Sequence, residues 1–127
     1  MSTVLVTGGA GSMGRLVCDR LASDGHIVKA LDLEIANFAN LPEGVVALPA
    51  DLTSTEDVHA AVKGVDAVVH LAAILPPVAD ELIELTQRVN VDGTRIIVDA
   101  IKNNVPSARL IFSSSVSVYG RPENDVE

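Results

Sequence analysis

The chain has 127 residues, 48% of them hydrophobic, which suits one domain with a core of its own. Its formal net charge is −8 at pH 7, and its cations form no basic stripe. A nucleic-acid partner is therefore not expected, because neutralising phosphates requires clustered Lys and Arg. The only cysteine, Cys18, excludes a disulfide framework within the chain. With no apolar run of membrane-spanning length and no signal-peptide pattern, we expect a cytoplasmic protein without a membrane partner.

Short apolar segments alternate with helical patterns along the chain. The short segments are rich in Val, Ile, Leu and Ala, as are strands of a parallel sheet that is covered on both faces. We predict such strands at residues 3–7, 26–32, 44–50, 66–73 and 108–115. Helices are predicted at residues 12–23, 54–63 and 79–104, and residues 33–44 are expected to hold only a turn. Strands that alternate with helices imply right-handed βαβ crossovers.

Two of the helices carry apolar residues at helical spacing. In the helix over 12–23, we expect one face to be formed by Met13, Leu16, Val17 and Leu21. The helix over 79–104 is the longest, and its expected apolar positions are Leu82, Ile83, Leu85, Val89, Ile96, Ile97 and Ile101. The helix over 54–63 has Thr53 or Ser54 as a candidate N-terminal cap.

The stretch VLVTGGAGSMGRLV, at residues 4–17, places four glycines directly after the first strand. A strand, a glycine-rich turn and a helix N-terminus together form an anion site, because the first N–H groups of the helix lack intrahelical partners. A Walker A loop would need Lys and then Ser or Thr after the last glycine, but Arg15 and Leu16 follow Gly14. A glycine-rich turn without a ligand is the alternative interpretation.

Asp32 ends the second predicted strand, eighteen residues after Gly14. A carboxylate at this spacing accepts hydrogen bonds from the ribose hydroxyls of a dinucleotide, although it could also be a solvated strand end. Leu33, Glu34 and Ile35 follow, so no cation is nearby in sequence to meet the 2′-phosphate of NADP. We therefore predict NAD in preference to NADP, on a Rossmann-type doubly wound sheet of strand order 3-2-1-4-5 with helices on both faces.

The glycine spacing T-G-x-x-G-x-x-G, with Gly8, Gly11 and Gly14, resembles the extended short-chain dehydrogenase/reductase superfamily, and within it the NAD-dependent epimerase/dehydratase family. DLTS at residues 51–54, HLAA at 70–73, VNVDGT at 89–94 and FSSSVSVYG at 112–120 match further motifs of this family in the same order. The resemblance covers essentially the whole chain. It implies a single NAD(P)-binding Rossmann domain over residues 1–127.

The resemblance also implies roles for particular residues. Ser12 and Met13 would offer backbone N–H groups to the pyrophosphate, and Asp51 and Leu52 would hold the adenine, although an Asp before a helix is also a common cap. Leu71, Ala72 and Ala73 would line the cofactor with their backbone, and Asn90 matches the family's helix Asn. By its position in the fifth-strand signature, Ser115 is the expected catalytic hydroxyl, with Ser114 as the fallback; a merely polar strand end is the alternative. The complete list of expected cofactor-binding residues is Gly8, Gly11, Ser12, Met13, Gly14, Asp32, Asp51, Leu52, Leu71, Ala72, Ala73 and Asn90.

The family's chemistry is hydride transfer aided by a Tyr-x-x-x-Lys pair, but Tyr119, the only tyrosine, is followed four positions on by Glu123. We therefore expect the N-terminal part of a longer, homodimeric enzyme, cut before its later strands and substrate lobe and inactive by itself. The expected substrate is a nucleotide sugar or a similar hydroxyl compound. A non-catalytic dinucleotide sensor and an interaction fragment without a cofactor are the alternatives. No His or Cys pair has metal-ligand spacing, so no metal is expected.

Overall fold

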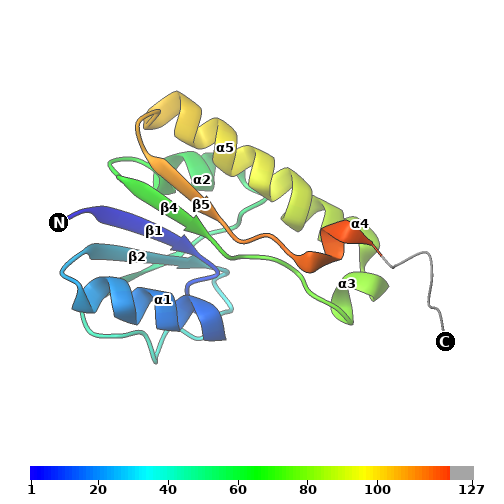
Figure 1. The fold of residues 1–127 in the computed structure, drawn as a ribbon, viewed down its shortest axis with the longest axis horizontal. Coiled ribbons are helices and arrows are strands. Elements are labelled where there is room, and N and C mark those ends of the chain that lie inside the picture. Colours follow the sequence, from blue (N-terminus) through cyan, green and yellow to red (C-terminus); the bar gives the residue numbers. More distant parts are fainter. Residues whose placement is uncertain (121–127) are drawn as a thin grey trace.

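Five parallel strands form one sheet in the order β3-β2-β1-β4-β5, as predicted, in the computed structural model, which describes residues 1–120 (Figure 1). The central strand, β1, is almost completely buried, which explains why its sequence is an unbroken run of apolar and β-branched residues. The strands are β1 (Thr3–Thr7), β2 (Ile27–Asp32), β3 (Val45–Pro49), β4 (Ala67–His70) and β5 (Arg109–Phe112).

The register of the strands aligns their carboxyl ends. Thr7, the last residue of β1, lies opposite Leu31 of β2 and His70 of β4. Asp32 in turn lies opposite Pro49, which ends β3. Four strands therefore end at the same edge of the sheet, and the turns that follow them meet there.

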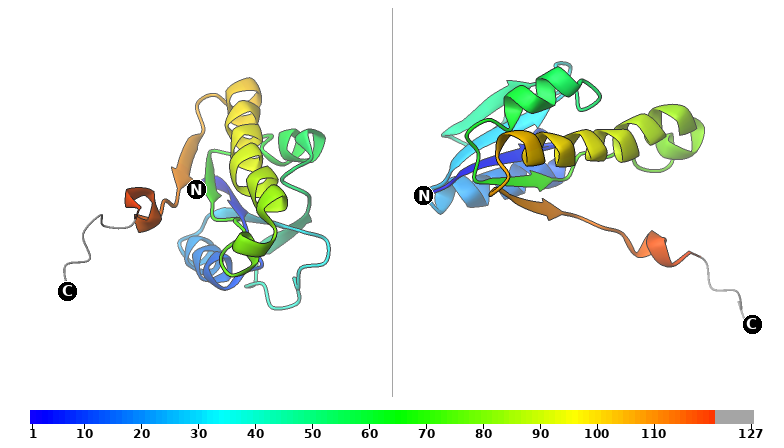
Figure 2. Two further views of the ribbon diagram at one scale, coloured as in Figure 1. Left: turned by 90° about the vertical axis from the view of Figure 1, so that its right-hand side faces the viewer. Right: turned by 90° about the horizontal axis from the view of Figure 1, so that it is seen from above.

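Helices cover both faces of the sheet, as predicted (Figure 2). One face packs against α1, and the core there includes Val6, Cys18 and Ala30. The other face packs against α2 and α5, with Leu5, Val58 and Ile97 in its core. The helical segments are α1 (Ser12–Ser23), α2 (Thr55–Ala61), α3 (Val78–Glu81), α4 (Ile83–Thr86), the π-helical η1 (Gln87–Asp92), α5 (Gly93–Asn104) and the 3₁₀-helical η2 (Val116–Tyr119). Residues 33–44 contain turns and no regular element, as expected.

The predicted buried face of α1 is partly wrong. Met13 and Leu16 are 62% and 67% exposed, whereas the fully buried positions of this helix are Gly14 and Cys18. The physical reason is the close approach at Gly14, which turns the side of the helix that carries residues 14 and 18 toward the sheet. Met13 consequently faces the edge where the strands end.

The predicted single helix over 79–104 is also wrong in its first part. Leu82 has φ −113° and ψ 61°, outside the helical region, and so separates α3 from α4. The helix then widens into the π-helical turn η1 before α5 begins. Ile97 and Ile101 are buried as expected, but Leu82 and Ile83 are 48% and 71% exposed. Within residues 1–120, no helix has both the length and the apolar character needed to cross a membrane.

Candidate functional site

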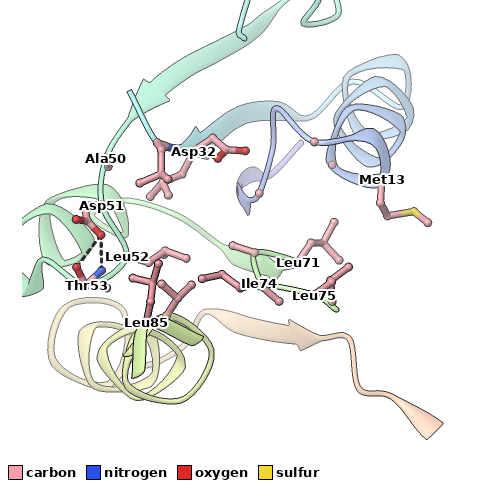
Figure 3. A pocket seen from close by; sticks show the side chains of 18 of the residues that line it. Met13, Asp32, Ala50, Asp51, Leu52, Thr53, Leu71, Ile74, Leu75 and Leu85 are labelled. Carbon is pink, nitrogen blue, oxygen red and sulfur yellow. Dashed lines mark hydrogen bonds between the residues drawn. The ribbon is translucent and has the colours of Figure 1, made fainter. Parts of the chain in front are cut away.

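A cavity of about 720 Å³ lies at the carboxyl ends of β1, β2, β3 and β4 (Figure 3). Its volume falls in the range of small-molecule and cofactor sites, and its place is the crevice where open α/β sheets bind ligands. The residues predicted to bind a cofactor come together here, with the exception of Asn90. Those that line the cavity are Gly8, Gly11, Ser12, Met13, Gly14, Asp32, Asp51, Leu52, Leu71, Ala72 and Ala73.

The glycine-rich turn brings the start of α1 directly against the end of β1. Gly8 has φ +70°, a conformation that glycine adopts without strain. A Cβ atom on Gly14 would collide with the carbonyl oxygen of Gly8, so only glycine allows this approach. Gly11 occupies the N-cap position of α1 and offers no side chain to cap the helix. The N–H groups of Ser12 and Met13 therefore stand at an uncapped helix N-terminus in the cavity wall, which suits an anion.

Asp32 connects the end of β2 to this turn. Its Oδ2 accepts a hydrogen bond from the backbone N–H of Ala10, with an N–O distance of 3.1 Å. Its Oδ1 accepts from the N–H of Leu33 at 2.9 Å. Each carboxylate oxygen retains acceptor capacity beyond these bonds. The side chain lines the cavity, so that capacity is available to hydroxyl groups of a ligand (Figure 3).

Asp51 also lines the cavity and follows β3. Its Oδ1 accepts hydrogen bonds from both the N–H and the hydroxyl of Thr53, each at 2.8 Å (Figure 3). The cap of α2 is Ser54, whose hydroxyl accepts from the N–H of Asp57 at 3.3 Å. The alternative interpretation of Asp51 as the helix cap is therefore wrong. The carboxylate stabilises the local turn while lining the cavity.

Residues 71–74 form the wall that follows β4. The hydroxyl of Thr7 accepts hydrogen bonds from the N–H groups of Leu71 and Ala72, both at 3.2 Å. The side chain of Asn90 accepts from the N–H of Ile74 at 2.8 Å and donates to its carbonyl oxygen at 2.9 Å. Asn90 thus lies outside the lining and acts on the cavity by holding one of its wall residues.

Several residues that line the cavity were not predicted from the sequence. Leu85, Arg88 and Val89 come from α4 and η1, and their i, i+3 and i+4 spacing places them on one helical face. The apolar pattern of that helix contained Leu85 and Val89, but the pattern by itself could not distinguish a core face from a cavity wall. The other lining residues that were missed are Leu31, Leu33, Ala50, Thr53, Ile74 and Leu75.

The serines proposed for catalysis are outside the cavity lining. The hydroxyl of Ser115 accepts a hydrogen bond from the N–H of Ser117 at 3.1 Å and caps η2. Ser114 and Ser115 are exposed, and Tyr119 is 88% exposed. Figure 2 shows that residues 113–120, which follow β5, run away from the sheet.

The histidines and the cysteine make contacts within the fold. The ring of His26 accepts a hydrogen bond from the N–H of Ser2 at 3.1 Å, and His59 lies 3.1 Å from the side-chain amide of Asn104. Cys18 is fully buried, and this burial raises the pKa of its thiol to about 11. Among residues 1–120, no group of three or more His, Cys, Asp or Glu side chains is placed to hold a metal ion.

The chain is similar to enzymes that are more than twice its length. A 3-beta-hydroxysteroid dehydrogenase of Mycolicibacterium neoaurum is 32% identical, and the match covers 93% of this chain and 33% of that protein. A D-erythronate dehydrogenase of Cupriavidus necator is 33% identical, with 92% of this chain and 40% of that protein covered. The chain therefore spans well under half the length of these relatives.

Solved structures agree with the fold. A UDP-glucose-4-epimerase from Stenotrophomonas maltophila, with bound NAD and formylated UDP-arabinopyranose, superposes with a TM-score of 0.85 at 28% identity, over 100% of this chain and 41% of that chain. A short-chain dehydrogenase/reductase superfamily protein from Agrobacterium tumefaciens, with bound NAD, gives a TM-score of 0.80 at 34% identity, over 96% and 36%. The model of the NAD dependent epimerase/dehydratase family matches residues 4–127. On this match and this fold, the chain belongs to the NAD-dependent epimerase/dehydratase family.

Proposed function

We propose that this chain binds NAD in the cavity at the carboxyl ends of β1 to β4. The observation that carries the proposal is the pairing of the uncapped N-terminus of α1 with the carboxylate of Asp32 in one cavity. The first is suited to a pyrophosphate and the second to the ribose hydroxyls. Asp51 and Leu52 would hold the adenine, and the wall at Leu71–Ala73 would lie along the cofactor.

The residues present fit a dinucleotide in shape as well as in charge. The absent Cβ atoms of Gly8 and Gly14 let the glycine-rich turn pack closely on itself and on Ala72, and the cavity volume of about 720 Å³ is in the cofactor range. Arg88 is the one cation among the lining residues that the structure describes, and it offsets some of the negative charge of Asp32 and Asp51. A bound diphosphate would meet the N-terminus of α1, whose backbone N–H groups favour an anion.

NAD is proposed in preference to NADP because Asp32 would repel the 2′-phosphate. Arg15 is a further cation on α1, and its Nη2 donates to the carbonyl oxygen of Asn37 at 2.7 Å. This bond attaches α1 to the turn region that follows β2. Since Arg15 is absent from the cavity lining, it leaves the preference for NAD in place.

NAD supplies a hydride acceptor when it is bound. We propose that the longer protein to which this chain would contribute is an epimerase, dehydratase or reductase acting on a nucleotide sugar or a similar hydroxyl compound. The relatives include sterol, sugar-acid and nucleotide-sugar enzymes by name, so their shared substrate feature is a hydroxyl group. In such a protein, Ser115, or Ser114 in its place, would bond the reacting oxygen of the substrate.

Calorimetric titration of the 127-residue chain with NAD, and separately with NADP, tests the proposal. Saturable binding with a lower Kd for NAD is the expected result. Tighter binding of NADP would contradict the assignment of Asp32, and no binding of either dinucleotide would leave the interaction fragment as the better interpretation. A spectrophotometric assay with NAD and a sugar nucleotide should show no turnover, because the chain has no Tyr-x-x-x-Lys pair.

A non-catalytic dinucleotide sensor on the same fold is the second candidate, because the serines proposed for catalysis lie outside the cavity lining. It predicts the same binding of NAD by the chain. The two candidates separate in the longer protein, where a sensor would bind NAD but lack turnover. Removing the hydroxyl of Ser115 would then leave its behaviour unchanged.

A further inference from the structure

A buried chain of hydrogen bonds crosses the sheet beside the cavity, and it is centred on His70. His70 is 3% exposed, and its ring has a threonine at each nitrogen. Its Nδ1 lies 2.6 Å from the hydroxyl of Thr7 on β1, and its Nε2 lies 2.8 Å from the hydroxyl of Thr94 on α5. Phe112 of β5 packs against the ring, with 5.9 Å between the ring centroids. His70 therefore joins β1, β4, β5 and α5 at one point.

The partners of Thr7 determine which ring nitrogen carries the proton. A hydroxyl group has one hydrogen to donate and two lone pairs to accept with. The Thr7 hydroxyl already accepts from the N–H groups of Leu71 and Ala72, and the Leu71 N–H is shared with the carbonyl oxygen of Thr7 at 3.3 Å. Its own hydrogen must then be donated to Nδ1 of His70, which is consequently the acceptor nitrogen of the ring.

The partners of Thr94 lead to the same assignment from the other side. The Thr94 hydroxyl donates its hydrogen to the carbonyl oxygen of Asn90 at 2.7 Å. It therefore meets Nε2 of His70 as an acceptor, and Nε2 must carry a hydrogen. Both sides agree on a neutral imidazole with its proton on Nε2. Burial, which lowers the pKa of His70, favours this neutral form as well.

We propose that His70, as the neutral Nε2–H tautomer, is a positioning residue for the cavity wall at Leu71 and Ala72. By accepting the hydrogen of Thr7, it orients the Thr7 hydroxyl so that both lone pairs face the two wall N–H groups. The wall then packs on the glycine-rich turn, where a Cβ on Gly8 would come within 3.0 Å of the Ala72 nitrogen. The functional consequence rests on the proposed function, because the wall matters for binding only if NAD contacts it.

The network also links the two attachments of the wall. At one end of the wall, Thr7 holds Leu71 and Ala72; at the other, the Asn90 side chain holds Ile74. Through Thr94, the carbonyl oxygen of Asn90 belongs to the same chain of hydrogen bonds. Cooperative hydrogen-bond chains of this kind restrict a backbone segment more strongly than isolated bonds do.

The tautomer is tested directly by ¹⁵N–¹H NMR of the imidazole in the unmutated chain at neutral pH without NAD. We expect a protonated Nε2 and an unprotonated Nδ1 for His70. A protonated Nδ1, or an imidazolium with both nitrogens protonated, would overturn the proposal. Because no cofactor is present, this result is independent of whether the chain binds NAD.

The effect on the wall is tested with a matched pair at position 7. Thr7→Val keeps the shape of the side chain but removes the hydroxyl, whereas Thr7→Ser keeps the hydroxyl. We expect faster amide exchange and a changed amide shift at Ala72 in Thr7→Val, and about tenfold weaker NAD binding, since a buried N–H loses its partner. Thr7→Ser should retain the Ala72 signal and bind NAD within about threefold of the unmutated chain. Equal behaviour of the two variants would overturn the proposal.

A second pair of variants, at position 70, distinguishes the contribution of Nδ1 from that of Nε2. Asn at this position places an amide oxygen near the site of Nδ1 and can accept from Thr7, whereas Gln reaches the site of Nε2 and can donate to Thr94. His70→Asn should therefore preserve the Ala72 amide signal better than His70→Gln, with each compared at equal folded fraction. The reverse order would contradict the assigned role, because a merely structural contribution would follow side-chain volume. If the unmutated chain fails to bind NAD, the proposed function fails, while these amide signals still decide the role of His70.

Discussion

The carboxylate of Asp32 accepts a hydrogen bond from the backbone N–H of Ala10, which ties the end of β2 to the glycine-rich turn across 3.1 Å. The same side chain faces the cavity, so it serves both the turn and a ligand. Asp32→Ala should weaken NAD binding by about ten- to hundredfold, because hydrogen bonds to a charged acceptor are lost. Asp32→Arg should weaken NAD binding as well and bring a gain in NADP affinity. Calorimetric titration measures both.

Asp24→Ala is the matched control for these variants. Asp24 is an exposed residue at the C-cap of α1, and its carboxylate forms an ion pair with Arg20 at 3.0 Å. Its removal changes the net charge by the same amount as Asp32→Ala but touches no cavity residue. NAD affinity should stay unchanged in the control, and an equal loss there would show a general charge effect instead of a specific contact.

Gly14→Ala should destabilise the fold and the cavity together. The new Cβ would collide with the backbone carbonyl of Gly8, so helix α1 must move away from the sheet. We expect the free energy of unfolding to fall by about 1–3 kcal/mol, as in other overpacked sites. Urea unfolding followed by circular dichroism measures this loss. Unchanged stability would mean that the close approach of α1 is dispensable.

Gly93→Ala is the same substitution in another helix, with the opposite sign expected. A Cβ there would lie 3.5 Å from the Cβ of Leu52, an ordinary contact distance, and Gly93 has helical φ and ψ. Replacing a helical glycine by alanine stabilises by about 0.5–1 kcal/mol where there is room. The same unfolding experiment tests it, and a loss of stability would show that the packing of α5 on Leu52 is tighter than the distance indicates.

His70 should make stability depend on pH. Burial lowers its pKa below the ordinary value of 6.5, and the side chains that contact it, Thr7, Thr94 and Phe112, are neutral. As the pH falls below 6.5, His70 becomes protonated in the unfolded chain while it stays neutral in the folded chain, so the free energy of unfolding decreases. Above pH 6.5, the contribution of His70 to stability is fully present. Urea unfolding at several pH values measures this. His70→Asn should show a smaller slope over the window, and an identical slope in both proteins would contradict the prediction.

Cys18 should react with thiol reagents only when the fold opens. Its side chain is fully buried, and its pKa is raised to about 11, so little thiolate exists at neutral pH. Labelling should be slow in buffer and should accelerate along the urea unfolding transition. A Cys18→Ala variant that also carries Ser23→Cys places a thiol at an exposed position of the same helix and should label at once. Equally fast labelling of the unmutated chain would mean that α1 separates from the sheet readily.

Ser115→Ala tests the proposed substrate-side hydroxyl, in a longer, active protein that contains this chain. Turnover should fall about a hundredfold while NAD affinity stays nearly the same, because the hydroxyl would bond the reacting oxygen and not the cofactor. Ser114→Ala is the companion variant. If it carries the kinetic effect in place of Ser115→Ala, the alignment within the serine run is off by one residue. An equal loss of NAD affinity would make Ser115 a binding or folding residue.

The sequence by itself determined the sheet, its strand order and the glycine-rich turn. These depend on local patterns: buried strands are continuous apolar runs, and the space between β1 and α1 accepts only glycine at Gly14. The residues at strand ends, such as Asp32 and Asp51, could likewise be predicted to meet, because parallel strands end at one edge of the sheet. Those residues do line one cavity.

Only the tertiary structure decided which helical faces are buried and how the cavity wall is held. Met13 and Leu16 continue an apolar pattern yet are exposed, because the approach at Gly14 sets the rotation of α1. The hydrogen bonds of His70 join it to Thr7, 63 positions earlier in the sequence, and to Thr94, 24 positions later. No local sequence pattern records contacts over such separations. Periodicity reports which residues are apolar, whereas the partners of a buried hydroxyl or imidazole depend on which strands and helices pack together. That is why the role of His70 could be inferred only once β1, β4 and α5 were placed in space.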